Sequence, residues 1–110
     1  MKDLCDQKSN LHYIYHRICI TCPEQYYVYN TETFFREAYI RVRGGRIEVH
    51  PCSGFDEEIE WDLVIFEHIF DDPWLGEIPS EQRDIMFAKI DAAIYAYWEH
   101  KKTYMQELLK

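Results

Sequence analysis

SEQRDIMFAKIDAAIYAYWEHKKTYMQELL, residues 80–109, is the stretch of this sequence that decides the fold. Pro79 is expected to end the preceding structural element, and the hydroxyl of Ser80 is expected to cap the first free amides of a helix. Apolar and polar side chains recur on opposite sides at steps of three and four residues, which is the period of an amphipathic helix. The apolar positions are Met86, Ile90, Ala93, Tyr97, Tyr104 and Leu108, and the polar positions are Asp84, Asp91, Glu99, Lys102 and Gln106. We therefore predict one long helix over 80–109.

The middle of this helix, from Ala92 to Trp98, carries no charge over seven residues. Here we expect the helix to be covered on more than one side, with a β-sheet as the main cover. The alternative is that this surface is shared with a partner or with a second copy in a homodimer.

The segment from Tyr39 to His50 is typical of a β-hairpin, with Gly44-Gly45 as a two-residue loop. Glycines accept the positive φ angles of a primed turn, and such a turn sets the register of the two strands. The expected pairs are Ile40 with Val49 and Val42 with Ile47 on one apolar face, and Arg41 with Glu48, Arg43 with Arg46 and Tyr39 with His50 on the other. That second face is expected to be solvated or to hold a ligand.

Two further strands are predicted before the hairpin. Residues 11–21 alternate between two sets of aromatic and β-branched side chains, which indicates a strand. After a turn at residues 22–25, Tyr26 to Tyr29 forms the next strand, antiparallel to the first because the connection is short. Residues 30–37 are compatible with a short helix or with a continuing strand.

Residues 56–70 fit two structures. Ile59, Leu63, Phe66 and Phe70 form a helical stripe, whereas Ile59, Trp61, Leu63 and Ile65 alternate as in a strand. We favour a helix because the acidic residues 56–58 suit its first turn. Residues 71–79 are predicted to form a loop because they contain two prolines and a glycine.

The fold class that follows is α+β in a single domain, residues 1–110. We expect an antiparallel sheet of three to five strands, from residues 11–50, packed against the long C-terminal helix, 80–109, and a second, shorter helix. A chain of 110 residues can bury a core without disulfides or metal. The first residues, 1–6, mix charges and lack the apolar segment of a secretory signal, so we expect a cytoplasmic protein with reduced cysteines.

The net charge of −8 is distributed unevenly along the chain. Residues 1–52 contain 7 Lys and Arg against 6 Asp and Glu, whereas residues 53–110 contain 5 against 14. The part between Asp56 and Asp84 has eleven carboxylates and one base, Arg83. Such a surface repels nucleic acid and favours basic partners.

This acidic stretch also contains two tryptophans, which suit buried anchors in a protein interface. Its candidate partner-binding residues are Asp56, Glu57, Glu58, Glu60, Trp61, Asp62, Glu67, Asp71, Asp72, Trp74 and Glu77. Carboxylates along a rigid surface can occupy a basic groove that otherwise holds phosphates. The hypothesis is therefore a non-catalytic, stoichiometric inhibitor of a basic nucleic-acid-handling protein, comparable in size and charge to the small anti-defence proteins of phages and mobile elements. An immunity-type protein that neutralises a basic nuclease requires the same chemistry, and a solvated acidic face that only keeps the domain soluble is the plainest alternative.

A zinc site is a further alternative. Cys19 and Cys22 have C-x-x-C spacing, and His50 and Cys52 could complete a Cys₃His set. Strand alternation counts against it, because it places the first two cysteines on opposite faces. The other interpretation is that the thiols fill apolar strand positions, and no cofactor is expected.

No catalytic signature is present. The sequence contains no G-x-S-x-G, H-E-x-x-H, phosphate loop or G-x-G-x-x-G. His12 and His16 share a strand face and Glu67 precedes His68, so an acid/base pair could form only through the tertiary structure. We predict that the protein is not an enzyme.

Overall fold

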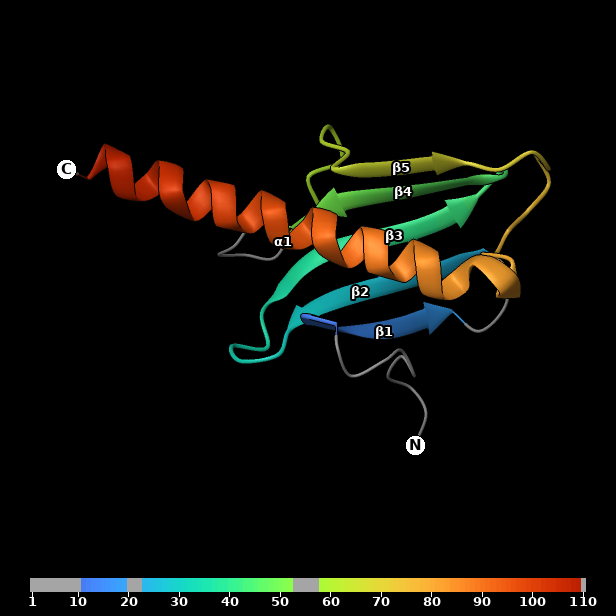
Figure 1. The fold of residues 1–110 in the computed structure, drawn as a ribbon, viewed down its shortest axis with the longest axis horizontal. Helices are drawn as coiled ribbons and strands as arrows, with labels where there is room; N and C mark the ends of the chain where they lie inside the picture. The colour runs from blue at the N-terminus through green and yellow to red at the C-terminus, as the bar shows by residue number, and fades with distance from the viewer. Residues whose placement is uncertain (1–10, 20–22, 53–57, 110) are drawn as a thin grey trace.

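The computed structural model describes residues 11–19, 23–52 and 58–109, which form one five-stranded antiparallel sheet and one long helix (Figure 1). The strands are neighbours in chain order, so the sheet contains no crossover between non-consecutive strands. The elements are β1 (Tyr13–Cys19), β2 (Glu24–Asn30), β3 (Arg36–Arg43), β4 (Arg46–Pro51), β5 (Phe66–Ile69), the short 3-10 helix η1 (Ser80–Gln82) and α1 (Arg83–Leu108). The α+β class is therefore confirmed. Helix α1 crosses one face of the sheet, and its C-terminal end extends past the sheet (Figure 1).

The hairpin of β3 and β4 has the predicted register. Arg43 pairs with Arg46, and the pairs continue without a shift to Tyr39 with His50. Gly44 and Gly45 have φ angles of 64° and 72°, as a primed turn requires. Its apolar side chains point toward α1 and form the centre of the core, where Ile40, Val42, Ile47 and Val49 are fully buried. The local turn chemistry thus decided where the core lies.

The shorter helix predicted over residues 56–70 is wrong. Within the described part, Cys52 and Ile59 form an isolated bridge, residues 61–62 turn, and residues 66–69 form β5 against β4. The sheet consequently has a strand beyond residue 50, which the sequence prediction placed outside the sheet. Strand β5 pairs with the edge of β4 and brings Phe66 against the core, a long-range contact that outweighs the acidic first-turn signal.

The long helix is confirmed, but its first turn and its buried face differ from the prediction. Ser80 belongs to η1, and neither η1 nor α1 has a side-chain cap. The buried face comprises Met86, Phe87, Ile90, Asp91 and Ile94. Tyr95 and Ala96 are exposed, so the expected cover on several sides is wrong. The reason is that one sheet touches only one side of the helix.

Past Trp98, the helix loses its support from the sheet. Tyr104 and Leu108, both predicted to be buried, are 56% and 62% exposed. The apolar stripe in the sequence therefore continues beyond the surface that covers it. No helix among the described residues has the length and the apolar character needed to cross a membrane.

Two buried carboxylates join the layers. Glu24, at the start of β2, pairs with Arg83 and accepts hydrogen bonds from the Tyr26 hydroxyl at 2.5 Å and the Ile78 amide at 2.8 Å. Asp91 of α1 is 3% exposed and binds residues at the start of β1. Polar groups buried this deeply require such partners.

Candidate partner-binding surface

The acidic residues predicted to bind a partner lie in β5, at one edge of the sheet, and in the segments that precede and follow β5 in the chain. Within the described residues they are Glu58, Glu60, Asp62, Glu67, Asp71, Asp72 and Glu77, and we call this set the acidic surface. Asp56 and Glu57 lie outside the described residues. Residues 58–77 contain these seven carboxylates and no lysine or arginine. This segment of the chain thus carries charge of one sign, and an arginine of the neighbouring strand, Arg46, lies beside it.

Backbone hydrogen bonds hold the second half of this region against the sheet. The amide of Gly45 donates to the carbonyl of Leu75 at 2.9 Å, and the amide of Glu24 donates to the carbonyl of Gly76 at 2.8 Å. At the start of the loop, the amide of Trp74 donates to Oδ1 of Asp72 at 2.9 Å. The loop after β5 is therefore fixed to the β3–β4 turn and to β2, and its carboxylates lie on a preorganised backbone.

Both tryptophans of the stretch are exposed. Trp74 is 89% exposed, and Trp61 is 54% exposed and packs edge-on against Tyr39, with a centroid separation of 5.4 Å. Other exposed apolar side chains in the same region are Leu63, Val64 and Ile69. Carboxylates mixed with exposed aromatic and aliphatic groups are the composition of a protein-binding patch.

One carboxylate of the acidic surface is paired with an arginine, and three others form no ion pair among the described residues. Glu67 forms an ion pair with Arg46 at 2.7 Å, and Arg46 also approaches Glu48 at 3.2 Å. Within the part of the chain that the structure describes, Glu60, Asp62 and Asp71 form no ion pair. Their charge is available to an incoming basic group.

The register separates the candidate zinc ligands. Cys19 is in β1 and His50 is in β4, and both β2 and β3 lie between them. At a spacing of about 4.8 Å per strand, their backbones are about 14 Å apart across the sheet, too far for both side chains to bind one ion. Cys52 is fully buried beyond the end of β4, and Cys22 lies outside the described residues. No group of three or more potential metal ligands occurs among the residues described.

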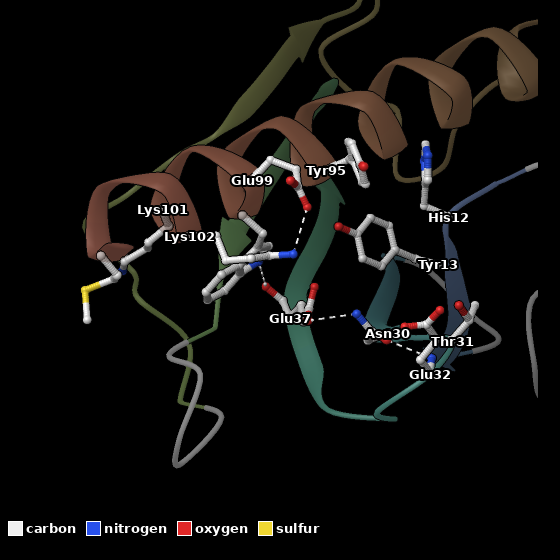
Figure 2. Close-up of a pocket in the computed structure, with 12 residues that line it drawn as sticks. His12, Tyr13, Asn30, Thr31, Glu32, Glu37, Tyr95, Glu99, Lys101 and Lys102 are labelled. Atoms are coloured by element: carbon white, nitrogen blue, oxygen red, sulfur yellow. Dashed lines mark hydrogen bonds and ion pairs between the residues drawn. The ribbon is translucent and has the colours of Figure 1, made fainter. Parts of the chain in front are cut away.

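A cavity of about 500 Å³ lies between α1 and the ends of β1 and β2 (Figure 2). At its rim, the imidazole of His12 stacks on Tyr95 with a centroid separation of 4.2 Å, and its Nδ1 lies 2.5 Å from Oδ1 of Asp91. Asp91 also accepts hydrogen bonds from the His12 amide, at 2.9 and 3.1 Å, and from the Tyr15 hydroxyl at 3.0 Å. The carboxylate therefore fixes the orientation of the imidazole.

Two groups in the cavity wall have a pKa that is raised by burial. Burial raises the pKa of Glu37, although a hydrogen bond from Asn30 and the charge of Lys102 oppose the shift. Burial also raises the pKa of Tyr13 above its ordinary value of 10.0. The sequence analysis predicted neither this cavity nor the pair of His12 with Asp91. The spacing of Phe87, Asp91 and Ile94 along the buried face was the signal that could have identified Asp91.

Comparison of the chain with protein-family models, with curated proteins and with solved structures gives no match.

Proposed function

We propose that this protein is a non-catalytic, stoichiometric binder that captures a basic protein through the acidic surface. The observation that carries the proposal is the segment 58–77, which contains β5 and has seven carboxylates without a lysine or arginine. A field of one sign accelerates association with an oppositely charged partner and disfavours anionic competitors.

The tryptophans supply the short-range part of binding. Trp74 projects from a hydrogen-bonded loop, so little conformational entropy is lost when it enters a pocket on the partner. Large aromatic side chains at the centre of such patches contribute most of the affinity in protein interfaces. The carboxylates then select a basic partner, and Trp74 holds it.

The partner class that fits best is a nucleic-acid-handling protein, because its working surface is a basic groove built for phosphates. Carboxylates bound there compete with the nucleic acid and block the enzyme. A nuclease neutralised by an immunity-type protein and a defence enzyme blocked by an anti-defence protein are the two settings that require this chemistry.

The test is capture from host lysate at two salt concentrations, with the captured proteins identified. The variant carries Glu60→Lys, Asp62→Lys and Asp71→Lys, three positions without ion pairs among the described residues. A control variant with the same change in charge carries Glu32→Lys, Glu81→Lys and Glu107→Lys, all exposed and away from β5.

We expect the native chain and the control to retain one basic partner at low salt and to release it at high salt. The β5-edge variant should lose that partner while its thermal stability changes by less than about 0.5 kcal/mol, as for ordinary surface substitutions. Equal capture by the β5-edge variant and the native chain would overturn the proposal.

A further inference from the structure

The face of the sheet turned away from α1, which we call the open face, carries a concentration of arginine. Ile40 and Val42 point into the core, so alternation along β3 places Arg41 and Arg43 on the open face. By the same alternation, Arg46 and Glu48 of β4 lie there, opposite Ile47 and Val49. Arg36 joins them, because its guanidinium lies 4.2 Å from the centroid of the Tyr27 ring. Four of the six arginines of the chain are thus on this face, together with Glu48 and its pairing partner on β5, Glu67.

A run of aromatic rings crosses the same face. Successive ring centroids are 6.5 Å apart from Tyr29 to Tyr27, 5.9 Å from Tyr27 to Tyr39, and 5.4 Å from Tyr39 to Trp61. The Trp61 ring stands at 71° to Tyr39 and is half exposed, so its indole remains accessible for stacking. The run passes over β2 and β3 and ends at the segment before β5.

A small pocket of about 100 Å³ adjoins the end of this run. It is lined by Arg41, Arg43, Arg46 and Glu48. Arg41 connects the two features, because it lines the pocket and also lies 5.7 Å from the centroid of Trp61. An anion in the pocket and a flat ring on Trp61 would therefore be close neighbours.

The pocket has an excess of positive charge. Arg43 lies directly opposite Arg46, and two like charges in that position destabilise a sheet. Arg46 is paired with Glu67 and Glu48, and Arg41 lies 3.8 Å from Glu48, but Arg43 has no ion-pair partner among the residues described. Guanidinium groups bind phosphate in a bidentate geometry and stack on aromatic rings, which lysine does less well. The unpaired arginine thus favours an oxyanion of phosphate size.

We propose that the open face binds a nucleotide, with its base stacked on Trp61 and its phosphate held by Arg41 and Arg43. The ligand is either a free nucleotide or one unit of a single strand, since both present a base beside a phosphate. The inference goes beyond the proposed capture of a basic protein and uses a different set of charges. Because the chain as a whole has a net charge of −8, binding depends on local contacts with one or two phosphates. The salt dependence of a strand should then be shallow, with a slope of log K against log[salt] between about −0.7 and −1.4.

The test uses fluorescence anisotropy with fluorescein-labelled oligouridylate of eight nucleotides, and ADP as a competitor. The two test variants are Arg43→Glu and Trp61→Ala. Their matched controls are Lys89→Glu, an exposed position on α1 at the other face, and Tyr104→Ala, an exposed aromatic residue near the end of α1. Far-UV circular dichroism and thermal melting check that all four variants are folded.

We expect each test variant to weaken binding by tenfold or more, as the loss of a stacking partner does, and each control to change it less than twofold. Competition by ADP at a concentration near the dissociation constant of the octamer identifies a free nucleotide as the ligand, and failure of ADP to compete identifies a strand. The inference is overturned if the native chain binds neither probe up to about 100 µM, or if the two test variants bind like their controls. Arg43 is outside the acidic surface, so the Arg43→Glu variant should still capture the basic partner. Capture by this variant therefore tests the proposed function separately from nucleotide binding.

Discussion

Arg83, the first residue of α1, and Glu24, the first residue of β2, form an ion pair although they are 59 residues apart in the chain. Glu24 is fully buried, and Arg83 also donates to the Tyr26 hydroxyl at 2.8 Å and to the Ile78 carbonyl at 3.1 Å. This network attaches the start of the helix to the sheet. Arg83 is the single base between Asp56 and Asp84, and the network gives this base a structural role.

Replacing Arg83 with Met should destabilise the fold by about 3 kcal/mol, because the carboxylate of Glu24 would remain buried without its cation. Urea denaturation monitored by circular dichroism measures the change. Arg46→Met is the matched control, since its ion pair with Glu67 is exposed and is expected to contribute less than about 1 kcal/mol. Similar losses in the two variants would contradict the role assigned to the buried pair.

The same network makes stability depend on pH on the acidic side. Burial alone would raise the pKa of Glu24, but the hydrogen bonds from Arg83, Tyr26 and the Ile78 amide and the charge of Arg83 outweigh it, so the pKa lies below its ordinary value of 4.5. Since the unfolded chain binds the proton more readily, this contribution is complete above pH 4.5 and is lost as the pH falls toward the lowered pKa. Denaturation of the native chain and of Glu24→Gln at several pH values should show a steeper acid loss in the native chain. Parallel curves for the two proteins would refute this assignment.

Asp91→Asn should cost about 1–3 kcal/mol, because Asp91 is the shared acceptor for the His12 amide, the His12 imidazole and the Tyr15 hydroxyl. Asp84→Asn, an exposed change on the same helix, should cost less than about 0.5 kcal/mol. Chemical denaturation of both variants measures the difference. An equal effect would mean that the buried carboxylate contributes no more than a surface one.

The two turn glycines should respond differently to alanine. A Cβ on Gly45 would lie 2.3 Å from the carbonyl oxygen of Asp72, whereas a Cβ on Gly44 has its nearest neighbour, the carbonyl oxygen of Pro73, at 4.0 Å. Both positions have positive φ, so Gly44→Ala should cost about 1–2 kcal/mol from backbone conformation alone. Gly45→Ala should cost more, because the loop after β5 has to move. Thermal melts that rank Gly44→Ala as the more damaging change would exclude this packing.

The end of α1 should be dispensable for folding. Residues 102–109 are all exposed, and Trp98, whose indole donates to the Glu37 carbonyl at 3.1 Å, is the last large side chain packed against the core. Removal of residues 103–110 should lower the helical circular dichroism signal while changing the free energy of unfolding by less than about 0.5 kcal/mol. A larger loss of stability would show that this segment is covered in solution.

Local chemistry was enough to predict the hairpin. Gly44-Gly45 decides the turn, the turn decides the register, and the side-chain period of two then separates Ile40 and Val42 from Arg41 and Arg43. The same period predicted β1 and β2. The open face with its arginine and aromatic side chains was therefore foreseeable as a surface that is solvated or holds a ligand, although its pocket was not.

Residues 56–70 could not be assigned from their own pattern, because Ile59 and Leu63 belong both to the helical stripe and to the strand alternation. The choice depended on β4, whose free edge offered backbone partners to residues 66–69. The candidate zinc set failed for a related reason. The set combined two pairs of closely spaced residues, one with Cys19 and one with His50. The order of the strands separates Cys19 from His50 by two intervening strands.

The sequence by itself determined the α+β class, the long C-terminal helix, the hairpin register and the acidic character of residues 58–77, since each depends on neighbours along the chain. The tertiary structure alone decided that Glu24 pairs with Arg83, that Asp91 is buried beside His12, and that β5 completes the sheet. Those contacts join residues 17 to 79 positions apart. Their free energy depends on which surfaces the packed layers bring together, and no local pattern contains that information.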